Sequence, residues 1–114
     1  MKYLLIHAAD ETLFEAGPEV DEAASTQLAA WIEEMVARGV LVHGDRLRPT
    51  TDATSVRVTE RDVLVVDGPF AETKEQITGY DLIDCADLDE AIEIASKHPT
   101  TRHGTIEVRP LWFQ

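Results

Sequence analysis

The sequence predicts a single α+β domain in which an antiparallel sheet carries two helices on one face. The apolar residues alternate between strand and helix spacing in the order strand, helix, strand, hairpin, strand, helix, strand. The chain has 114 residues, enough for one hydrophobic core and too few for two. No repeat or low-complexity linker divides the sequence, so we treat residues 1–114 as one domain.

Local signals place each element. In chain order we expect strands at residues 2–7, 40–47, 54–59, 62–66, 79–85 and 105–112, helices at about residues 19–38 and from residue 88 to Pro99, and loops at residues 10–17 and 48–53. Gly39 stands where a helix commonly ends, and Asp87 with Glu90 forms a capping box that starts the second helix. The residues expected to point inward are Leu28, Trp31, Ile32, Met35, Val36, Leu88, Ala91, Ile92 and Ala95.

This order of elements is that of a ferredoxin-like sandwich with an inserted β-hairpin. Two helices cover only one face of the sheet. We expect the other, helix-free face to carry Tyr3 and Leu5 beside polar residues, and an apolar face of this kind is rarely left to water. A second copy of the chain is the simplest cover, so we predict a homodimer.

Composition excludes several classes of partner. The formal net charge is −12, from 22 acidic and 10 basic residues. Proteins that bind nucleic acid or anionic membranes concentrate Lys and Arg on one face, so neither partner is expected. The one cysteine, Cys85, excludes an internal disulfide and a site of several thiolates, and no apolar run is long enough for a signal or a membrane span. We predict a cytoplasmic protein.

The stretch from residue 67 to residue 75 reads DGPFAETKE and connects two predicted strands. A Gly followed by Pro stops the first of them, because Gly accepts a positive φ and Pro has no N–H for the ladder. The run resembles the signature of the DGPF branch of the YCII-related proteins. The similarity extends from the opening MKYLLI to the closing residues 108–110.

The resemblance carries expectations about assembly and chemistry. It implies a dimeric α+β barrel, and a genetic setting near extracytoplasmic-function sigma factors that makes such a factor a possible partner. The related YciI-type members look as if they use a His/Asp dyad, with the His on the first helix and the Asp near the end of the second. Here the matching stretches are residues 25–28 (STQL) and 96–99 (SKHP), so that dyad is not carried over.

The helix-free face is the predicted site. Alternation along the strands sends His7, His43, Asp45, Glu107 and Arg109 to that face, with Tyr80 or Asp81 according to the register of the fifth strand. His43 and Asp45 lie about 7 Å apart, so Asp45 is predicted to orient His43 as a general base, and Arg109 to hold an anionic substrate. The structural alternative is an ion pair between Glu107 and Arg109 beside hydrogen-bonded histidines.

The DGPFAETKE loop is the second candidate region. Asp67 is expected either to cap the turn or to form the rim of the cleft with Glu72 and Lys74, with Phe70 as an apolar wall. His98 and His103 flank a proline but have no carboxylate at ligand spacing, so no metal site is predicted. No glycine-rich phosphate loop or serine-nucleophile motif is present, and no tightly bound cofactor is expected.

Two functions remain open from the sequence. The first is an enzyme or binding protein that acts on a small molecule by acid–base chemistry in a cleft on the helix-free face. The alternative is a non-enzymatic accessory or regulatory module linked to a sigma-factor system.

Overall fold

The computed structural model describes residues 1–14 and 22–114. Its main elements are β1 (Lys2–Ala9), α1 (Glu22–Ala37), β2 (Leu41–Arg46), β3 (Thr54–Thr59), β4 (Asp62–Asp67), β5 (Gln76–Asp84), α2 (Leu88–Ser96) and β6 (Gly104–Pro110). Short 3-10 helices lie at η1 (Glu11–Phe14), η2 (Thr50–Asp52) and η3 (Pro99–Arg102). The predicted element order and the ferredoxin-like α+β class are confirmed. The expected helix start near residue 19, and residues 15–17 of the predicted loop, lie outside the described residues.

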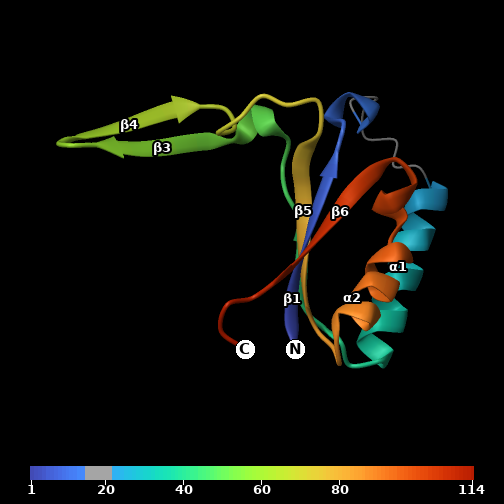
Figure 1. The fold of residues 1–114 in the computed structure, drawn as a ribbon. Coiled ribbons are helices and arrows are strands. Elements are labelled where there is room, and N and C mark those ends of the chain that lie inside the picture. The colour runs from blue at the N-terminus through green and yellow to red at the C-terminus, as the bar shows by residue number, and fades with distance from the viewer. Residues whose placement is uncertain (15–21) are drawn as a thin grey trace.

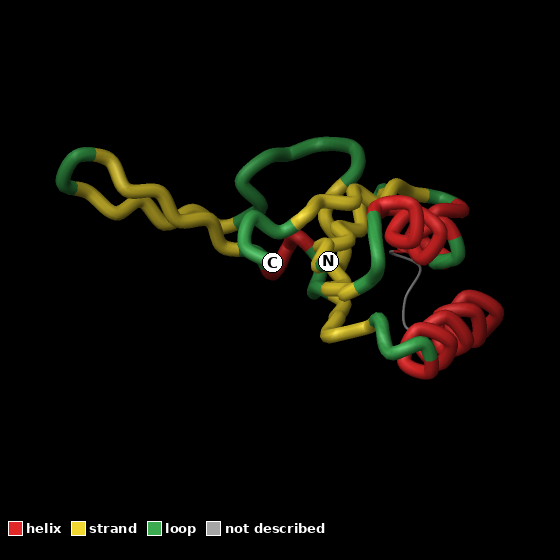
Figure 2. Tube along the Cα trace, turned by 60° about the horizontal axis from the view of Figure 1, so that its bottom comes forward, coloured by secondary structure: helices red, strands yellow, loops and turns green. Residues whose placement is uncertain are grey.

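The main sheet has the strand order β2-β5-β1-β6, and every neighbouring pair is antiparallel. Helices α1 and α2 both lie on one side of this sheet (Figure 1). Strands β3 and β4 form a separate two-stranded sheet that projects away from the main one, as Figure 2 shows from another direction. We call this hairpin the arm, and the side of the main sheet opposite the helices the helix-free face.

The core lies between the main sheet and the two helices. Its largest fully buried side chains are Leu5, Met35, Ile83 and Ile94. Tyr3 and Leu5 were predicted on the helix-free face, and that prediction is wrong: both are buried in the core. Because β1 is apolar at odd and even positions alike, its alternation does not indicate which side the helices cover.

The helices bury narrower stripes than their apolar spacing predicts. Trp31, Met35, Ala91 and Ala95 are buried as expected. The other predicted inward residues are at least a third exposed: Leu28, Ile32, Val36, Leu88 and Ile92. The last strand also ends earlier than expected, at Pro110, and Trp112 beyond it is exposed. Several large apolar side chains therefore remain at the surface of the described chain.

Caps and turns follow the sequence signals closely. The Asp87 carboxylate accepts from the backbone N–H of Glu90, and the Glu90 carboxylate accepts from that of Ala86, each at 2.9 Å. This is the predicted capping box. Gly39, just past α1, has φ +71°, where a residue with a Cβ is strained. At the base of the arm Gly68 donates to the Ala53 carbonyl at 2.7 Å.

Candidate functional sites on opposite faces of the sheet

Most of the residues predicted on the helix-free face do lie there. Strand pairing sets Tyr80 beside both Ile6 and Asp45, and it sets Glu107 opposite Ile6. Paired residues project to the same side of a sheet. By the same reasoning the helix-free face carries His43, Asp45, Tyr80, Glu107 and Arg109 around an apolar floor of Leu4, Ile6 and Leu82. The open question of register is settled for Tyr80, since Asp81 is buried on the helix side.

His43 on this face has a different partner from the one predicted. The Tyr80 hydroxyl and His43 Nδ1 are 2.9 Å apart, and the two rings lie 5.6 Å apart between centroids. Asp45 instead accepts from the backbone N–H of Arg46 at 2.7 Å. The predicted orienting contact from Asp45 to His43 is thus replaced by a phenol–imidazole hydrogen bond.

Arg109 and Glu107 form the ion pair that the structural alternative predicted. Arg109 Nη2 and Glu107 Oε2 are 2.5 Å apart, with both side chains more than half exposed. Surface ion pairs of this kind contribute little to stability. The Arg109 side chain is therefore paired with one carboxylate and still largely exposed.

Part of the DGPFAETKE loop lines a hollow at the surface. Asp67 is the last residue of β4, and the turn after it is held by a Ser55 hydroxyl that donates to the Gly68 carbonyl at 2.7 Å. Phe70 is 83% exposed. Glu72 and Lys74 line a hollow of about 240 Å³ together with Asp10, Glu11, Thr12, Thr50, Pro69, Thr73 and Gln76.

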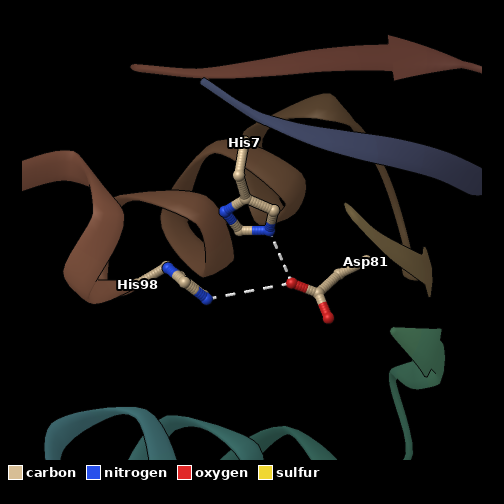
Figure 3. Close-up of side chains that lie close together, drawn as sticks. All are labelled: His7, Asp81 and His98. Atoms are coloured by element: carbon tan, nitrogen blue, oxygen red, sulfur yellow. Dashed lines mark hydrogen bonds and ion pairs between the residues drawn. The ribbon is translucent and has the colours of Figure 1, made fainter. Parts of the chain in front are cut away.

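His7 is the predicted site residue that the structure moves to the other face. It was expected on the helix-free side, but it is 4% exposed and lies under the helices. The reason is again that β1 is apolar at odd and even positions alike. His7 has the same parity in the strand as Tyr3 and Leu5, so it lies with them on the buried side. Its neighbours there are Asp81 and His98, and we call these three residues the buried cluster (Figure 3).

The buried cluster is built around one carboxylate. His7 Nε2 lies 2.6 Å from Asp81 Oδ2, and His98 Nε2 lies 3.8 Å from the same oxygen. The rings of His7 and His98 are 4.2 Å apart between centroids, and Trp31 meets His98 edge-on at 4.7 Å. All three cluster residues are at least nine-tenths buried. Ionisable groups are rarely buried to this extent unless they are paired.

Local sequence features hold the cluster in place. The Asp81 carboxylate occupies space above Gly44, where a Cβ would lie 1.8 Å from Asp81 Oδ1. His98 precedes η3, and its Nδ1 accepts from the backbone N–H of Thr100 at 3.1 Å. A side chain at position 44 or the loss of the η3 turn would therefore disturb the arrangement.

The protonation state of His98 follows from its surroundings. Burial, and after it the nearby charges of His7 and His103, lower the pKa of His98 from 6.5 to about 3. His98 is therefore neutral at physiological pH, and because its Nδ1 accepts a hydrogen bond, its Nε2 carries the proton.

Sequence reasoning considered the members of this cluster one at a time. Asp81 entered only as the alternative to Tyr80, and His98 only as a poor metal ligand. One signal was available: Asp81 and His7 each interrupt a strongly apolar strand, and a titratable residue there needs a partner. His98 gave no such signal, because its position depends on the loop between α2 and η3.

Comparison with known proteins fixes the family. The model of the YCII-related domain matches residues 1–113. The chain belongs to the YCII-related family. It is also 43% identical over 116 residues to an uncharacterized protein of Rhizobium meliloti (strain 1021), with 97% of this chain and 92% of the relative covered. Within the described residues no helix of this YCII-related chain is long and apolar enough to span a bilayer.

Proposed function

We propose that this YCII-related protein binds a small molecule on the helix-free face and transforms it by acid–base chemistry. The observation that carries the proposal is the 2.9 Å hydrogen bond between Tyr80 and His43. Whichever group donates, this bond occupies Nδ1 and leaves Nε2 of the imidazole for a ligand. Imidazole and phenol together provide a proton acceptor and a proton donor, as general acid–base chemistry requires.

The arrangement of the strands suggests the size of the ligand. His43 and Tyr80 lie on β2 and β5, whereas Arg109 lies on β6, and β1 with its apolar side chains separates β5 from β6. Two strand spacings amount to about 10 Å. A ligand with an anionic group on Arg109 and a protic group near Tyr80 would span this distance over the floor formed by Leu4 and Ile6.

We propose that a second copy of the chain covers this face. The floor residues are only half-buried, and a ligand held on one open sheet face keeps most of its surface in water. Pockets that bind small molecules enclose most of the ligand. A homodimer with two facing sheets would supply that enclosure, in agreement with the assembly that the resemblance implies. Light scattering at micromolar concentration should give twice the mass of one chain. A monomer would contradict the proposed homodimer.

Ligand binding is tested with benzoate as an anionic, partly apolar probe. Saturation-transfer NMR should show benzoate bound to the wild type. In Arg109→Gln the Kd should rise roughly tenfold or more, because one charge-assisted hydrogen bond is lost. Arg57→Gln removes a cation from the exposed arm and serves as the matched control, with no change expected. Equal affinity in Arg109→Gln and the wild type would reject the helix-free face as the binding site.

A second candidate function is that of a protein-binding accessory module. The arm favours it, because Val56, Val58, Val63 and Val65 form two directly paired valine pairs and each is more than 60% exposed. Such an apolar stripe is typical of a surface that contacts another protein. An association with a sigma factor stays a prediction. It is checked by capture from lysate with the wild type and with Val56→Ser/Val65→Ser; equal capture by both would reject the arm as the contact.

A further inference from the structure

The buried cluster is a second arrangement of acid–base groups that the proposed function does not use. His7, Asp81 and His98 come from β1, from β5 and from the turn before η3, and the core surrounds them. Burial of polar and charged groups is costly unless their hydrogen bonds are satisfied. One cluster atom is not satisfied: His7 Nδ1 is buried and has no hydrogen-bond partner among the described residues. A buried unpaired polar atom in a native protein calls for an explanation.

A metal ion is the first explanation to test. One ligand atom from each cluster residue lies within 4.8 Å of the others, a spacing compatible with a bound ion. A histidine that binds a metal through one nitrogen normally donates its other N–H to an acceptor. His98 does the reverse, since its Nδ1 accepts from Thr100. If His7 bound a metal through Nε2, it would leave a buried N–H on Nδ1 with no acceptor. The outer contacts of both imidazoles therefore disfavour a metal.

The hydrogen bonds fit a proton-accepting pair better. At 2.6 Å the contact between His7 Nε2 and Asp81 Oδ2 is that of an N–H donating to a carboxylate. His7 then carries its proton on Nε2, and Nδ1 keeps a lone pair. A carboxylate that holds one nitrogen of an imidazole while the other stays free is the arrangement of a general base, because the carboxylate fixes the tautomer and stabilises the imidazolium that forms.

His98 adds a donor next to this base. Its Nε2–H lies 3.8 Å from Asp81, too far for a direct hydrogen bond, so that N–H remains available. Its ring also lines a groove of about 420 Å³ between α1 and the segment from Ser96 to Arg102, together with Trp31. The Trp31 indole is held in place by an N–H that donates to the Ile94 carbonyl at 3.0 Å. His98 thus lies between the groove and His7, whose ring it contacts.

We propose that the buried cluster is a catalytic site for a small carbonyl compound, with His7 as the general base, Asp81 as its positioning residue and His98 as the hydrogen-bond donor. His7 Nδ1 takes a proton from a carbon next to the carbonyl group. The electron pair of that C–H bond moves into an enolate, whose oxygen accepts from His98 Nε2–H. Return of the proton from the imidazolium to another atom of the enolate gives an isomer, so the step balances without a further reactant.

This site is independent of the helix-free face. NMR without a ligand tests the positions of the ring protons on which the proposal depends. In protein labelled with ¹⁵N-histidine, long-range ¹H–¹⁵N spectra should show the His7 and His98 rings with the proton on Nε2 and a lone pair on Nδ1. Asp81→Asn should change the tautomer equilibrium of His7, an effect that a purely packing role of Asp81 would not produce. A His7 protonated on Nδ1 in the wild type would overturn the proposal.

Zinc provides the second measurement. Titration with Zn²⁺ alone should leave the ring signals of His7 and His98 unshifted at one equivalent. Stoichiometric binding that shifts both rings, and that is lost in His7→Gln, would overturn the proposal in favour of a metal site.

Proton exchange tests the chemistry directly. Dihydroxyacetone, pyruvate and acetoin are incubated in D₂O with the protein, and the loss of the C–H signals next to each carbonyl is followed by ¹H NMR. The wild type should accelerate exchange in at least one of them. His7→Phe and His7→Gln should lower that rate roughly 10²-fold or more, the usual contribution of a general base. Asp62→Asn, the same chemical change as Asp81→Asn at an exposed carboxylate of the arm, should leave it unchanged.

The exchange experiment also separates the two sites. A rate that falls in Tyr80→Phe but not in the His7 variants would place the base on the helix-free face and overturn this proposal. Exchange in none of the three compounds would overturn it as well. Thermal unfolding followed by circular dichroism identifies any variant that fails to fold, and the wild-type NMR spectrum decides the proposal in that case.

Discussion

Tyr80 and Asp81 are adjacent on β5, yet they contribute to two very different environments. Tyr80 pairs with His43 on the exposed face, whereas Asp81 pairs with His7 at 2.6 Å among core residues. On the exposed face water competes for every hydrogen bond. The pair of Tyr80 and His43 is therefore accessible, but few other contacts fix its geometry. In the core the geometry is fixed by packing, and His7 and Asp81 are at least nine-tenths buried. Accessibility and preorganisation are thus divided between the two faces of one strand.

The largest expected difference between the faces is in stability. Asp81→Ala removes the partner of a buried imidazole and should lower the free energy of unfolding by roughly 3 kcal/mol. Tyr80→Phe removes one exposed hydroxyl and should lower it by less than about 1 kcal/mol. Urea unfolding of both variants measures the contrast. Equal losses would mean that the cluster is not buried in solution as it is in the structure.

A substitution at Gly44 tests whether the Asp81 carboxylate needs the free space that this glycine leaves. In Gly44→Ala the new methyl group would overlap the Asp81 carboxylate. We expect a loss of about 2 kcal/mol from overpacking, and a change in the His7 ring signals. Gly39→Ala is the control, because it strains the backbone at φ +71° with nothing within 4 Å of the added atom. It should cost about 1 kcal/mol and leave the His7 signals in place.

The lowered pKa of His98 predicts a dependence of stability on pH. Folded His98 stays neutral down to about pH 3, whereas unfolded His98 takes up a proton below about pH 6.5. The contribution of neutral His98 to the free energy of unfolding is therefore fully present above pH 6.5, and it is lost as the pH falls below that value. Between pH 7 and pH 5 the loss should be roughly 1–2 kcal/mol. Urea unfolding of wild type and His98→Gln at both pH values checks this, and an identical pH dependence would contradict the lowered pKa.

The smallest effect is expected at the exposed ion pair. Arg109→Gln should change the free energy of unfolding by less than about 0.5 kcal/mol, and 0.5 M salt should reduce even this difference. Its effect on benzoate binding is predicted to be larger. A loss of stability comparable to that of Asp81→Ala would show that the helix-free face is far less exposed in the assembled protein than in a single chain.

The sequence predicted the fold because the fold depends on local signals. Caps at Asp87 and Gly39 and the alternation of apolar residues were sufficient for the element order. The site depends on which side of β1 the helices cover, and a strand with Leu4 and Ile6 on one side and Tyr3 and Leu5 on the other carries no such information. The same ambiguity placed His7 on the wrong face. The structure does contain a His–carboxylate pair, His7 with Asp81, but its members are separated by 74 positions and meet only through strand register.

The arm described above also bears on the behaviour of the protein in solution. Each of its strands has one partner, so both outer edges keep unpaired backbone groups beside exposed valines, a combination that favours edge-to-edge aggregation. The net charge of −12 opposes such contacts through mutual repulsion between chains. This repulsion vanishes near the isoelectric point, about 4.5, so acidification should drive the purified protein into β-rich precipitates that arm variants with polar residues resist.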